Sequence, residues 1–131
     1  MTTPFKPVGW FEIYVDEMPR ARAFYEATLN IQLDPMPTPG DEEGLEMWAF
    51  PDAMDMAKPG CSGALCKMKG FQPGSGGTII YFLCEDCAIV ASRAAAHGGT
   101  IYKEKMSIGD YGFIAIVGDS EGNTIGLHSM V

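Results

Sequence analysis

The stretch FEIYVDEMPRARAFY, residues 11–25, predicts a strand that leads directly into a helix. The run from Val8 to Val15 is rich in aromatic and β-branched residues, which is typical of a strand. Asp16 and Glu17 then place negative charge at a helix start, and Pro19 suits a first-turn position. Apolar residues recur at three- and four-residue spacing and give this helix one apolar stripe, made of Ala21, Phe24, Tyr25, Thr28 and Leu29.

The same order of elements is expected a second time after the glycine-rich stretch QPGSGG, residues 72–77. Thr78 to Cys84 is again an apolar, strand-like run, and Glu85 and Asp86 again open a helix. Three short strands should follow each helix: Ile31–Leu33, Leu45–Phe50 and Gly63–Met68 in the first copy, and Thr100–Tyr102, Tyr111–Val117 and Thr124–Ser129 in the second. A strand, a helix and three strands, repeated over about 60 residues, predict an α+β fold whose two halves must associate to bury a core.

Composition limits the classes of partner. Apolar residues make up 47% of the 131 residues and charged residues 20%, as in ordinary globular proteins. Acidic residues outnumber basic ones by 17 to 9, and the absence of a Lys/Arg cluster argues against binding to nucleic acid or to an anionic membrane. Met1 to Pro7 lacks an export signal, and the longest apolar run, Ile79 to Cys84, is too short to span a bilayer. We therefore expect a cytoplasmic protein whose four cysteines are reduced thiols.

Residues 11–25 resemble the opening of the glyoxalase/bleomycin-resistance/dioxygenase group, also called the vicinal oxygen chelate superfamily. That opening is a strand, an acidic pair and a helix that carries a Phe-Tyr pair before Leu-Gly, for which this chain has Leu29-Asn30. The turn DSEGNTIGL, residues 119–127, is similar to the family's Asp-Pro-Glu-Gly-Asn turn before its last strand.

The resemblance covers about residues 8–130 and implies a single glyoxalase-like domain over residues 1–131. Module one would span about 8–70, a linker about 71–77, and module two about 78–130. The implied architecture is two βαβββ modules whose curved mixed sheets enclose a cleft, with the helices outside. By the same analogy, we expect a homodimer.

Members of this family that use a metal hold it with four side chains from the first and last strands of each module. Carried over residue by residue, the resemblance places these positions on Trp10, Ile79 and Gly126 and, to within one residue, on Gly63. None of these side chains can bind a cation. We therefore expect no metal and no cofactor.

If those positions mark the cleft, strand alternation predicts its lining. Large aromatic residues on flanking strands would close the pocket, and Lys67 would join if the register of its strand holds. His97 is interpreted as a polar helix-end residue, whereas His128, two residues after Gly126, should face the cleft. The expected ligand-binding set is Trp10, Glu12, Tyr14, Trp48, Lys67, Ile79, Tyr81, Tyr111 and His128. No catalytic residue is predicted.

Glu12 has two interpretations: a general base or anchor for a cationic ligand group, or a structural carboxylate paired with Lys67 or a backbone N–H. The first functional hypothesis is a metal-free protein that binds an aromatic or cationic small molecule. The alternative is a lyase/isomerase-type or dioxygenase-type enzyme of the same superfamily that uses Glu12, His128 or an unrecognised metal site. A redox or zinc role for Cys84 and Cys87 is disfavoured, because the two carboxylates between them oppose thiolate formation.

Overall fold

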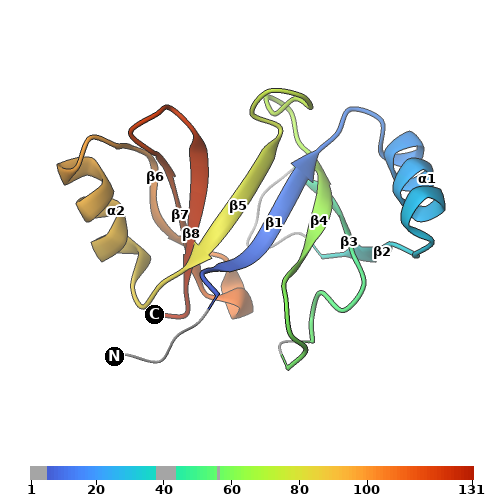
Figure 1. The fold of residues 1–131 in the computed structure, drawn as a ribbon, viewed down its shortest axis with the longest axis horizontal. Coiled ribbons are helices and arrows are strands. Elements are labelled where there is room, and N and C mark those ends of the chain that lie inside the picture. Colours follow the sequence, from blue (N-terminus) through green and yellow to red (C-terminus); the bar gives the residue numbers. More distant parts are fainter. Residues whose placement is uncertain (1–5, 38–43, 56) are drawn as a thin grey trace. The chain divides into compact units, whose positions relative to one another are not determined.

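A computed structural model describes residues 6–37, 44–55 and 57–131 of the chain (Figure 1). In chain order its elements are β1 (Val8–Tyr14), α1 (Met18–Leu29), β2 (Asp34–Met36), β3 (Glu46–Ala49), β4 (Ser62–Lys67), β5 (Thr78–Leu83), α2 (Cys87–Ala96), β6 (Thr100–Ser107), a 3₁₀ turn η1 (Gly109–Tyr111), β7 (Phe113–Gly118) and β8 (Thr124–Ser129). The order strand, helix and three strands thus occurs twice, which confirms the predicted α+β class and the βαβββ repeat.

The chain divides into two compact units, and each is described here by itself. The N-terminal unit is Phe11–Ile79; the C-terminal unit runs from Ile80 to Val131 and includes the start of the chain up to Trp10. The boundary therefore passes through β1 and β5, so the first strand contributes its beginning to the C-terminal unit. The division into modules 8–70 and 78–130 within a single domain stays a prediction of the sequence.

In the N-terminal unit the hydrogen-bonded strands have the order β2-β3-β4-β1. β3 is antiparallel to both β2 and β4, with Trp48 opposite Leu65. One face of this sheet packs against α1 through an apolar core of Val15, Met18, Leu33, Phe50 and Leu65. Phe11, Ile13, Tyr25 and Trp48 pack around that core. The apolar stripe predicted for the helix therefore reaches the core through Ala21 and Tyr25, while Phe24 and Leu29 are exposed.

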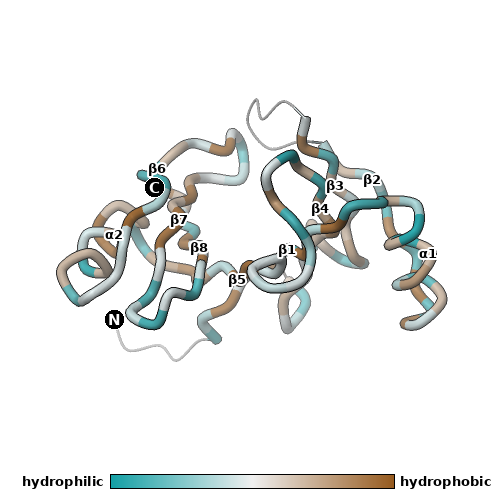
Figure 2. The backbone as a smooth tube through the Cα atoms, turned by 90° about the horizontal axis from the view of Figure 1, so that it is seen from above, coloured by the Kyte–Doolittle hydropathy of each residue, from teal (hydrophilic) through white to brown (hydrophobic). Residues whose placement is uncertain are grey.

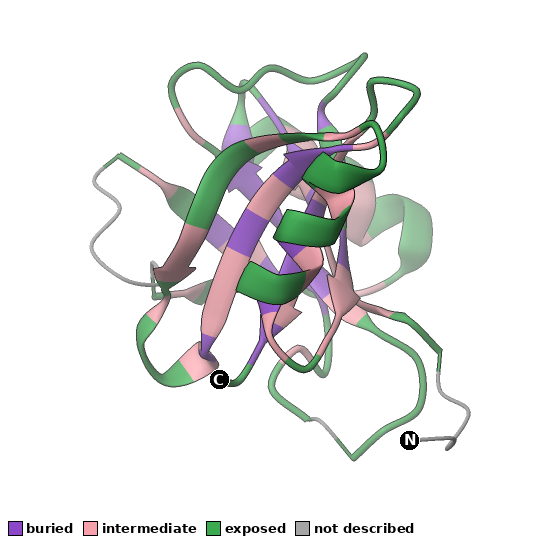
Figure 3. Ribbon diagram, turned by 90° about the vertical axis from the view of Figure 1, so that its left-hand side faces the viewer, coloured by how far each residue is buried: buried purple, intermediate pink, exposed green. Residues whose placement is uncertain are grey.

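In the C-terminal unit the strand order is β1-β5-β8-β7-β6. β5 and β8 are parallel, whereas β7 is antiparallel to both β8 and β6, so the sheet is mixed. The apolar character of β7 is visible in Figure 2. One face packs against α2 through Cys87, Ala91, Ala115, Val117 and Leu127, and Figure 3 shows the outer face of α2 exposed.

The two helices begin differently. Glu17 precedes α1 without a side-chain capping hydrogen bond, whereas the Asp86 carboxylate accepts a hydrogen bond from the Ala88 N–H at the start of α2. α1 ends at Asn30 in the left-handed conformation, at φ 54°, as the sequence predicts. Neither helix that the structure describes has the length and apolar character needed to cross a membrane.

Two predicted strand positions are wrong. The short strand expected at Ile31–Leu33 lies at Asp34–Met36 instead, because the Leu33 N–H donates to the Glu26 carboxylate and the Leu33 side chain enters the α1 core. Tyr111, expected to start a strand, lies in η1. Gly109, the first residue of this turn, and Gly112, which follows it, have positive φ, 73° and 101°, which interrupts the extended backbone before β7.

Candidate functional site

Glu12 and Tyr14 lie on the sheet face of the N-terminal unit that is opposite α1. Their neighbours Phe11 and Ile13 pack toward the α1 core, so strand alternation places Glu12 and Tyr14 on the other side. Both side chains are buried, with exposed fractions of 9% and 7%. The Tyr14 hydroxyl donates to Oε1 of Glu12 at 3.0 Å, and the Tyr14 ring stacks on Phe71 with 4.9 Å between centroids. We call this surface the non-helix face of the N-terminal unit.

Cys66 of β4 shares this face. It alternates with Leu65, which belongs to the α1 core, and it is fully buried opposite Met47 of β3. Burial, with a further contribution from the negative charge of Glu12, raises the pKa of the Cys66 thiol far above its usual range. The thiol is therefore protonated and uncharged at neutral pH, so it adds no charge to the face that carries Glu12.

Trp48 and Lys67 lie on the opposite face, the α1 side of the sheet. In the β3–β4 register Trp48 is opposite Leu65, and Glu46 is opposite Lys67. A Cβ added to Gly63 would lie 2.7 Å from Cγ of Phe11, a member of the α1 core, so Gly63 also faces the helix. The expected orientation of Lys67 is therefore wrong by one residue of register: it points away from Glu12.

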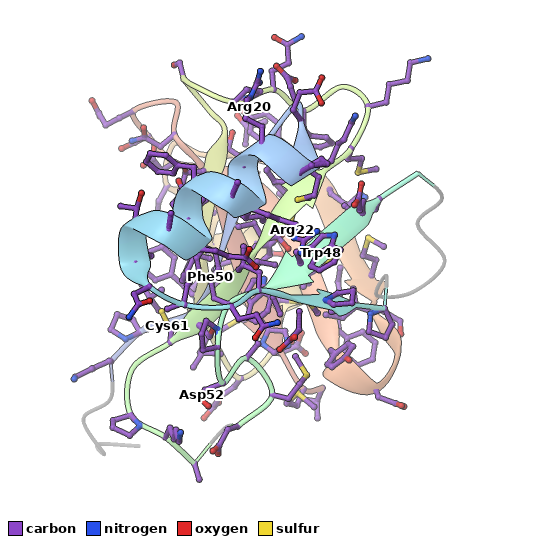
Figure 4. The ribbon with its side chains drawn as sticks, turned by 90° about the vertical axis from the view of Figure 1, so that its right-hand side faces the viewer. Arg20, Arg22, Trp48, Phe50, Asp52 and Cys61 are labelled. Atoms are coloured by element: carbon purple, nitrogen blue, oxygen red, sulfur yellow. The ribbon has the colours of Figure 1, made fainter. Side chains whose placement is uncertain are left out.

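Trp48 is held by side chains that the sequence analysis did not single out. The Arg22 guanidinium of α1 lies 3.5 Å from the centre of the Trp48 ring, and the Trp48 indole N–H donates to Glu46 at 3.0 Å (Figure 4). Arg22 also lies 3.9 Å from Glu26, one helical turn further on. The i, i+4 spacing of Arg22 and Glu26 is visible in the sequence, but the tryptophan partner is not. This arrangement favours a structural role for Trp48, joining α1 to β3 by a cation–π contact.

Tyr81 and His128 lie together on the C-terminal unit's sheet face opposite α2, as strand alternation predicts. Ile125, Leu127 and Phe82 pack toward α2, so Gly126, His128 and Tyr81 have the other orientation. Gly126 is paired with Tyr81, and a Cβ added to it would lie 2.2 Å from the Tyr81 ring. The glycine therefore leaves the space that the buried tyrosine ring fills. We call this surface the non-helix face of the C-terminal unit.

His128 is anchored to the η1 turn. Its Nε2 atom lies 2.5 Å from the backbone carbonyl oxygen of Tyr111. Tyr111, which was expected to close the pocket with its ring, meets His128 through its backbone carbonyl group. The imidazole is half-buried, directly opposite Ile114 of β7 and beside Leu83 of β5.

The two remaining predicted residues, Ile79 and Trp10, belong to different units. Ile79 is buried in the part of β5 that belongs to the N-terminal unit, and Trp10 is half-buried in the part of β1 that belongs to the C-terminal unit. That all nine residues line one cleft stays a prediction.

The side chains at the family's ligand positions do not suit a divalent cation. Trp10, Ile79 and Gly126 offer no oxygen, nitrogen or sulfur donor for coordination, and the indole nitrogen of Trp10 is a donor of hydrogen only. On β4 the residues that share a face with Glu12 are Ala64 and Cys66, and the Cys66 thiol is protonated. Within residues 6–37, 44–55 and 57–131 no group of three or more His, Cys, Asp or Glu side chains is placed to hold a metal ion.

The strand order, the paired βαβββ units and the two sheet faces define an α+β protein of the vicinal oxygen chelate architecture. A sequence model of the glyoxalase/bleomycin resistance protein/dioxygenase superfamily matches residues 8–127, and the chain belongs to that superfamily. A comparison with curated proteins finds none that matches the chain.

Similar solved structures share the fold over nearly the whole chain. Methylmalonyl-CoA epimerase from Mycobacterium tuberculosis is 16% identical, with a TM-score of 0.63 and coverage of 100% of this chain and 92% of the epimerase. A variant of the Streptomyces coelicolor methylmalonyl-CoA epimerase in complex with 2-nitronate-propionyl-CoA is 15% identical, with a TM-score of 0.61 and coverage of 96% and 95%. A hypothetical protein from Bacillus halodurans is 10% identical, with a TM-score of 0.67 and coverage of 93% and 92%. At these identities the likeness shows the fold alone.

Proposed function

We propose that this protein binds a small organic molecule that carries a cationic or aromatic group, without a metal ion, and that Glu12 anchors the ligand. The observation that supports this most is the buried carboxylate of Glu12 on the non-helix face, held by the Tyr14 hydroxyl at 3.0 Å. Small-molecule sites are mostly apolar walls with a few placed polar groups, and the surroundings of Glu12 have this character.

The chemistry of the face suits a cation better than an anion. A buried carboxylate attracts a positive charge more strongly than an exposed one, and Glu12 keeps only 9% of its surface exposed. The stacked rings of Tyr14 and Phe71 offer a π surface beside it, and Phe71 keeps 42% of its surface exposed. An ammonium group attached to an aromatic ring could satisfy both features at once.

The absence of coordinating donors at the family's ligand positions supports the metal-free part of the proposal. Its alternative, an enzyme of the same superfamily, has one specific feature in its favour: the half-buried imidazole of His128 on the non-helix face of the C-terminal unit. Imidazole is the commonest general acid or base in enzymes. The cytoplasmic location and the homodimer stay predictions of the sequence.

The proposal is tested with benzylamine, a cationic aromatic probe, and benzyl alcohol, a neutral probe of nearly the same size, by titration calorimetry. Glu12→Gln removes the negative charge of the carboxylate. It should weaken benzylamine binding at least tenfold, because the ammonium group of the bound probe would lose its charged partner, while the binding of benzyl alcohol changes little. Glu46→Gln is the matched control, since Glu46 lies on the α1 face of the same sheet. Equal benzylamine binding by wild type and Glu12→Gln, with both variants folded, would refute the anchor. A stoichiometric divalent ion in the purified protein would refute the metal-free part.

A further inference from the structure

The two histidines of the chain are held through opposite ring nitrogens. In His128 the Nε2 atom lies 2.5 Å from the Tyr111 carbonyl oxygen, whereas in His97 the Nδ1 atom lies 2.8 Å from the Arg93 carbonyl oxygen. A carbonyl oxygen can only accept a hydrogen bond, so the nitrogen that faces it carries the hydrogen. When the ring of His128 is neutral, its lone pair is therefore on Nδ1.

The backbone around η1 fixes the position of that carbonyl group. The Gly112 N–H donates to the Gly109 carbonyl at 3.2 Å, and the Ile108 N–H donates to the Gly112 carbonyl at 2.8 Å. These two bonds close the turn on either side of Tyr111. The acceptor for His128 is thus a main-chain group, which no side-chain substitution at Tyr111 removes.

The sheet face around His128 carries both apolar and polar side chains. Ile114 is directly opposite His128 on β7, and Leu83 is its partner on β5. Tyr81, paired with Gly126, and Lys103, paired with Ile116, lie on the same face. Among the residues that the structure describes, none forms a hydrogen bond to Nδ1, and Nδ1 is not closed off from solvent. The Nδ1 lone pair is therefore an acceptor that is open to a donor supplied by a ligand.

We propose that Nδ1 of His128 is a hydrogen-bond acceptor for a hydroxyl or N–H group of a small organic molecule bound on the non-helix face of the C-terminal unit, and that the Tyr111 carbonyl is the positioning group that fixes its tautomer. This inference rests on the proposed function, because it takes the protein to be a small-molecule binding protein. The ligand class is narrowed to molecules that carry a hydroxyl or N–H donor next to an apolar or aromatic part.

The tautomer is measured directly on protein with ¹⁵N-labelled histidine, by long-range ¹H–¹⁵N correlation at a pH where the rings are neutral. His128 should show the hydrogen on Nε2, and His97 should show it on Nδ1. His97→Gln assigns the two patterns, since it removes one of the only two histidines. A hydrogen on Nδ1 of His128 would overturn the proposal.

Ligand binding is measured with phenol, which has a hydroxyl donor, and anisole, in which a methyl group replaces the hydroxyl hydrogen. Phenol should move the Nδ1 resonance of His128 and bind about fivefold more tightly than anisole, as expected for one hydrogen bond of ordinary strength. If both probes bind equally, or if neither moves the Nδ1 resonance, the proposal is wrong.

Two variants separate recognition from a merely structural role. The side-chain oxygen of Asn is as many bonds from the backbone as Nδ1, whereas the amide of Gln reaches the position of Nε2. His128→Asn should therefore keep most of the preference for phenol over anisole, and His128→Gln should lose it. If instead His128→Gln keeps the preference for phenol and His128→Asn loses it, His128 only anchors η1 and the proposal is wrong. The binding of benzylamine to Glu12→Gln is a separate measurement. If Glu12→Gln binds benzylamine as tightly as wild type does, but phenol still binds more tightly than anisole, the proposed function is refuted and the role of His128 is not.

Discussion

The two units repeat one order of elements but present different chemistry on their non-helix faces. The N-terminal unit buries a carboxylate, Glu12, under a tyrosine hydroxyl. The C-terminal unit presents the imidazole of His128 on a face that it shares with Ile114 and Tyr81. One face thus carries a carboxylate and the other an imidazole, so the two units repeat one backbone plan while each sheet face has its own chemistry.

The glycines of the final strands differ in the same way. In β4, Gly63 leaves space on the α1 side, where a Cβ would meet both the ring and the backbone oxygen of Phe11. In β8, Gly126 leaves space on the non-helix face, where a Cβ would meet only the Tyr81 ring. Equivalent positions in sequence are therefore not equivalent in the fold, and the comparison can be tested by substitution.

The largest effect is expected for Gly63→Ala. The new methyl group would lie 2.2 Å from the Phe11 carbonyl oxygen, and a backbone atom in a sheet cannot move aside as a side chain can. We expect a loss of about 3 kcal/mol in the free energy of unfolding, against about 1.5 kcal/mol for Gly126→Ala. Urea denaturation of both variants measures this difference. Thr78→Ala, at an exposed strand position, is the control and should change little.

A greater loss in Gly126→Ala than in Gly63→Ala would contradict the conclusion that the Phe11 backbone can move aside less readily than the Tyr81 ring. Binding of phenol by Gly126→Ala gives a second measure. The added methyl group should displace the Tyr81 ring on the face that carries His128. Gly63→Ala, provided that this variant folds, should leave that face unchanged.

A smaller effect is expected from the helix starts. Asp86→Ala removes both the cap on Ala88 and the Lys105 partner at 3.0 Å, and should lower the melting temperature by about 3 °C. Glu17→Ala is the matched variant at α1, and because Glu17 makes no capping hydrogen bond, it should leave the melting temperature unchanged. Thermal unfolding, followed by circular dichroism, measures the melting temperatures of both variants. Equal decreases in melting temperature would contradict the conclusion that Asp86 caps its helix and Glu17 does not.

The contribution of Asp86 depends on pH in a definite direction. Its hydrogen bond with Lys105, followed by that with the Ala88 N–H, lowers the pKa of the carboxyl below its ordinary value of 3.8. A group with a lowered folded-state pKa stabilises the protein fully above its unfolded-state pKa and loses that effect as the pH falls through the folded-state value. The melting-temperature gap between wild type and Asp86→Ala should therefore be constant near neutral pH and shrink below about pH 4.

The mildest test leaves the fold unchanged and compares the reactivity of an exposed and a buried thiol of the N-terminal unit. Cys61 is exposed, whereas Cys66 is fully buried and burial raises the pKa of its thiol. Cys61 should react with a disulfide reagent at least about a thousandfold faster than Cys66, which becomes accessible only through unfolding. Reagent consumption over time measures both rates. Cys61→Ser should remove the fast phase, and rapid reaction of a second thiol in the N-terminal unit would contradict the burial of Cys66.

Much of the fold follows from local patterns in the sequence. The run of residues 11–25 and the acidic residues that precede each helix predict both helices, and alternation predicts the shared face of Tyr81 and His128. Short strands are less certain, because β2 has only three residues and its position depends on the contact between Glu26 and the Leu33 N–H. Such a side-chain contact has no signature in the periodicity of the chain.

The candidate site was predicted less completely, for a reason of register. A shift of one residue moves a side chain to the other face of a sheet, and this is how Lys67 was misplaced. The packing of Trp48 under Arg22 and the tautomer of His128 depend on partners far away in the sequence. No spacing rule connects residues 22 and 48, or 111 and 128, so only the fold reveals these pairs.

The division of the first strand between the units has a consequence for synthesis on the ribosome. Pro7 accepts a hydrogen bond from the Leu83 N–H, within the unit that also includes the final strand. Pro7 therefore gains this native neighbour late, only after the chain has been translated beyond residue 83. A fusion that tethers the amino terminus should slow this late closure, since joining distant segments is the step that limits folding of such topologies.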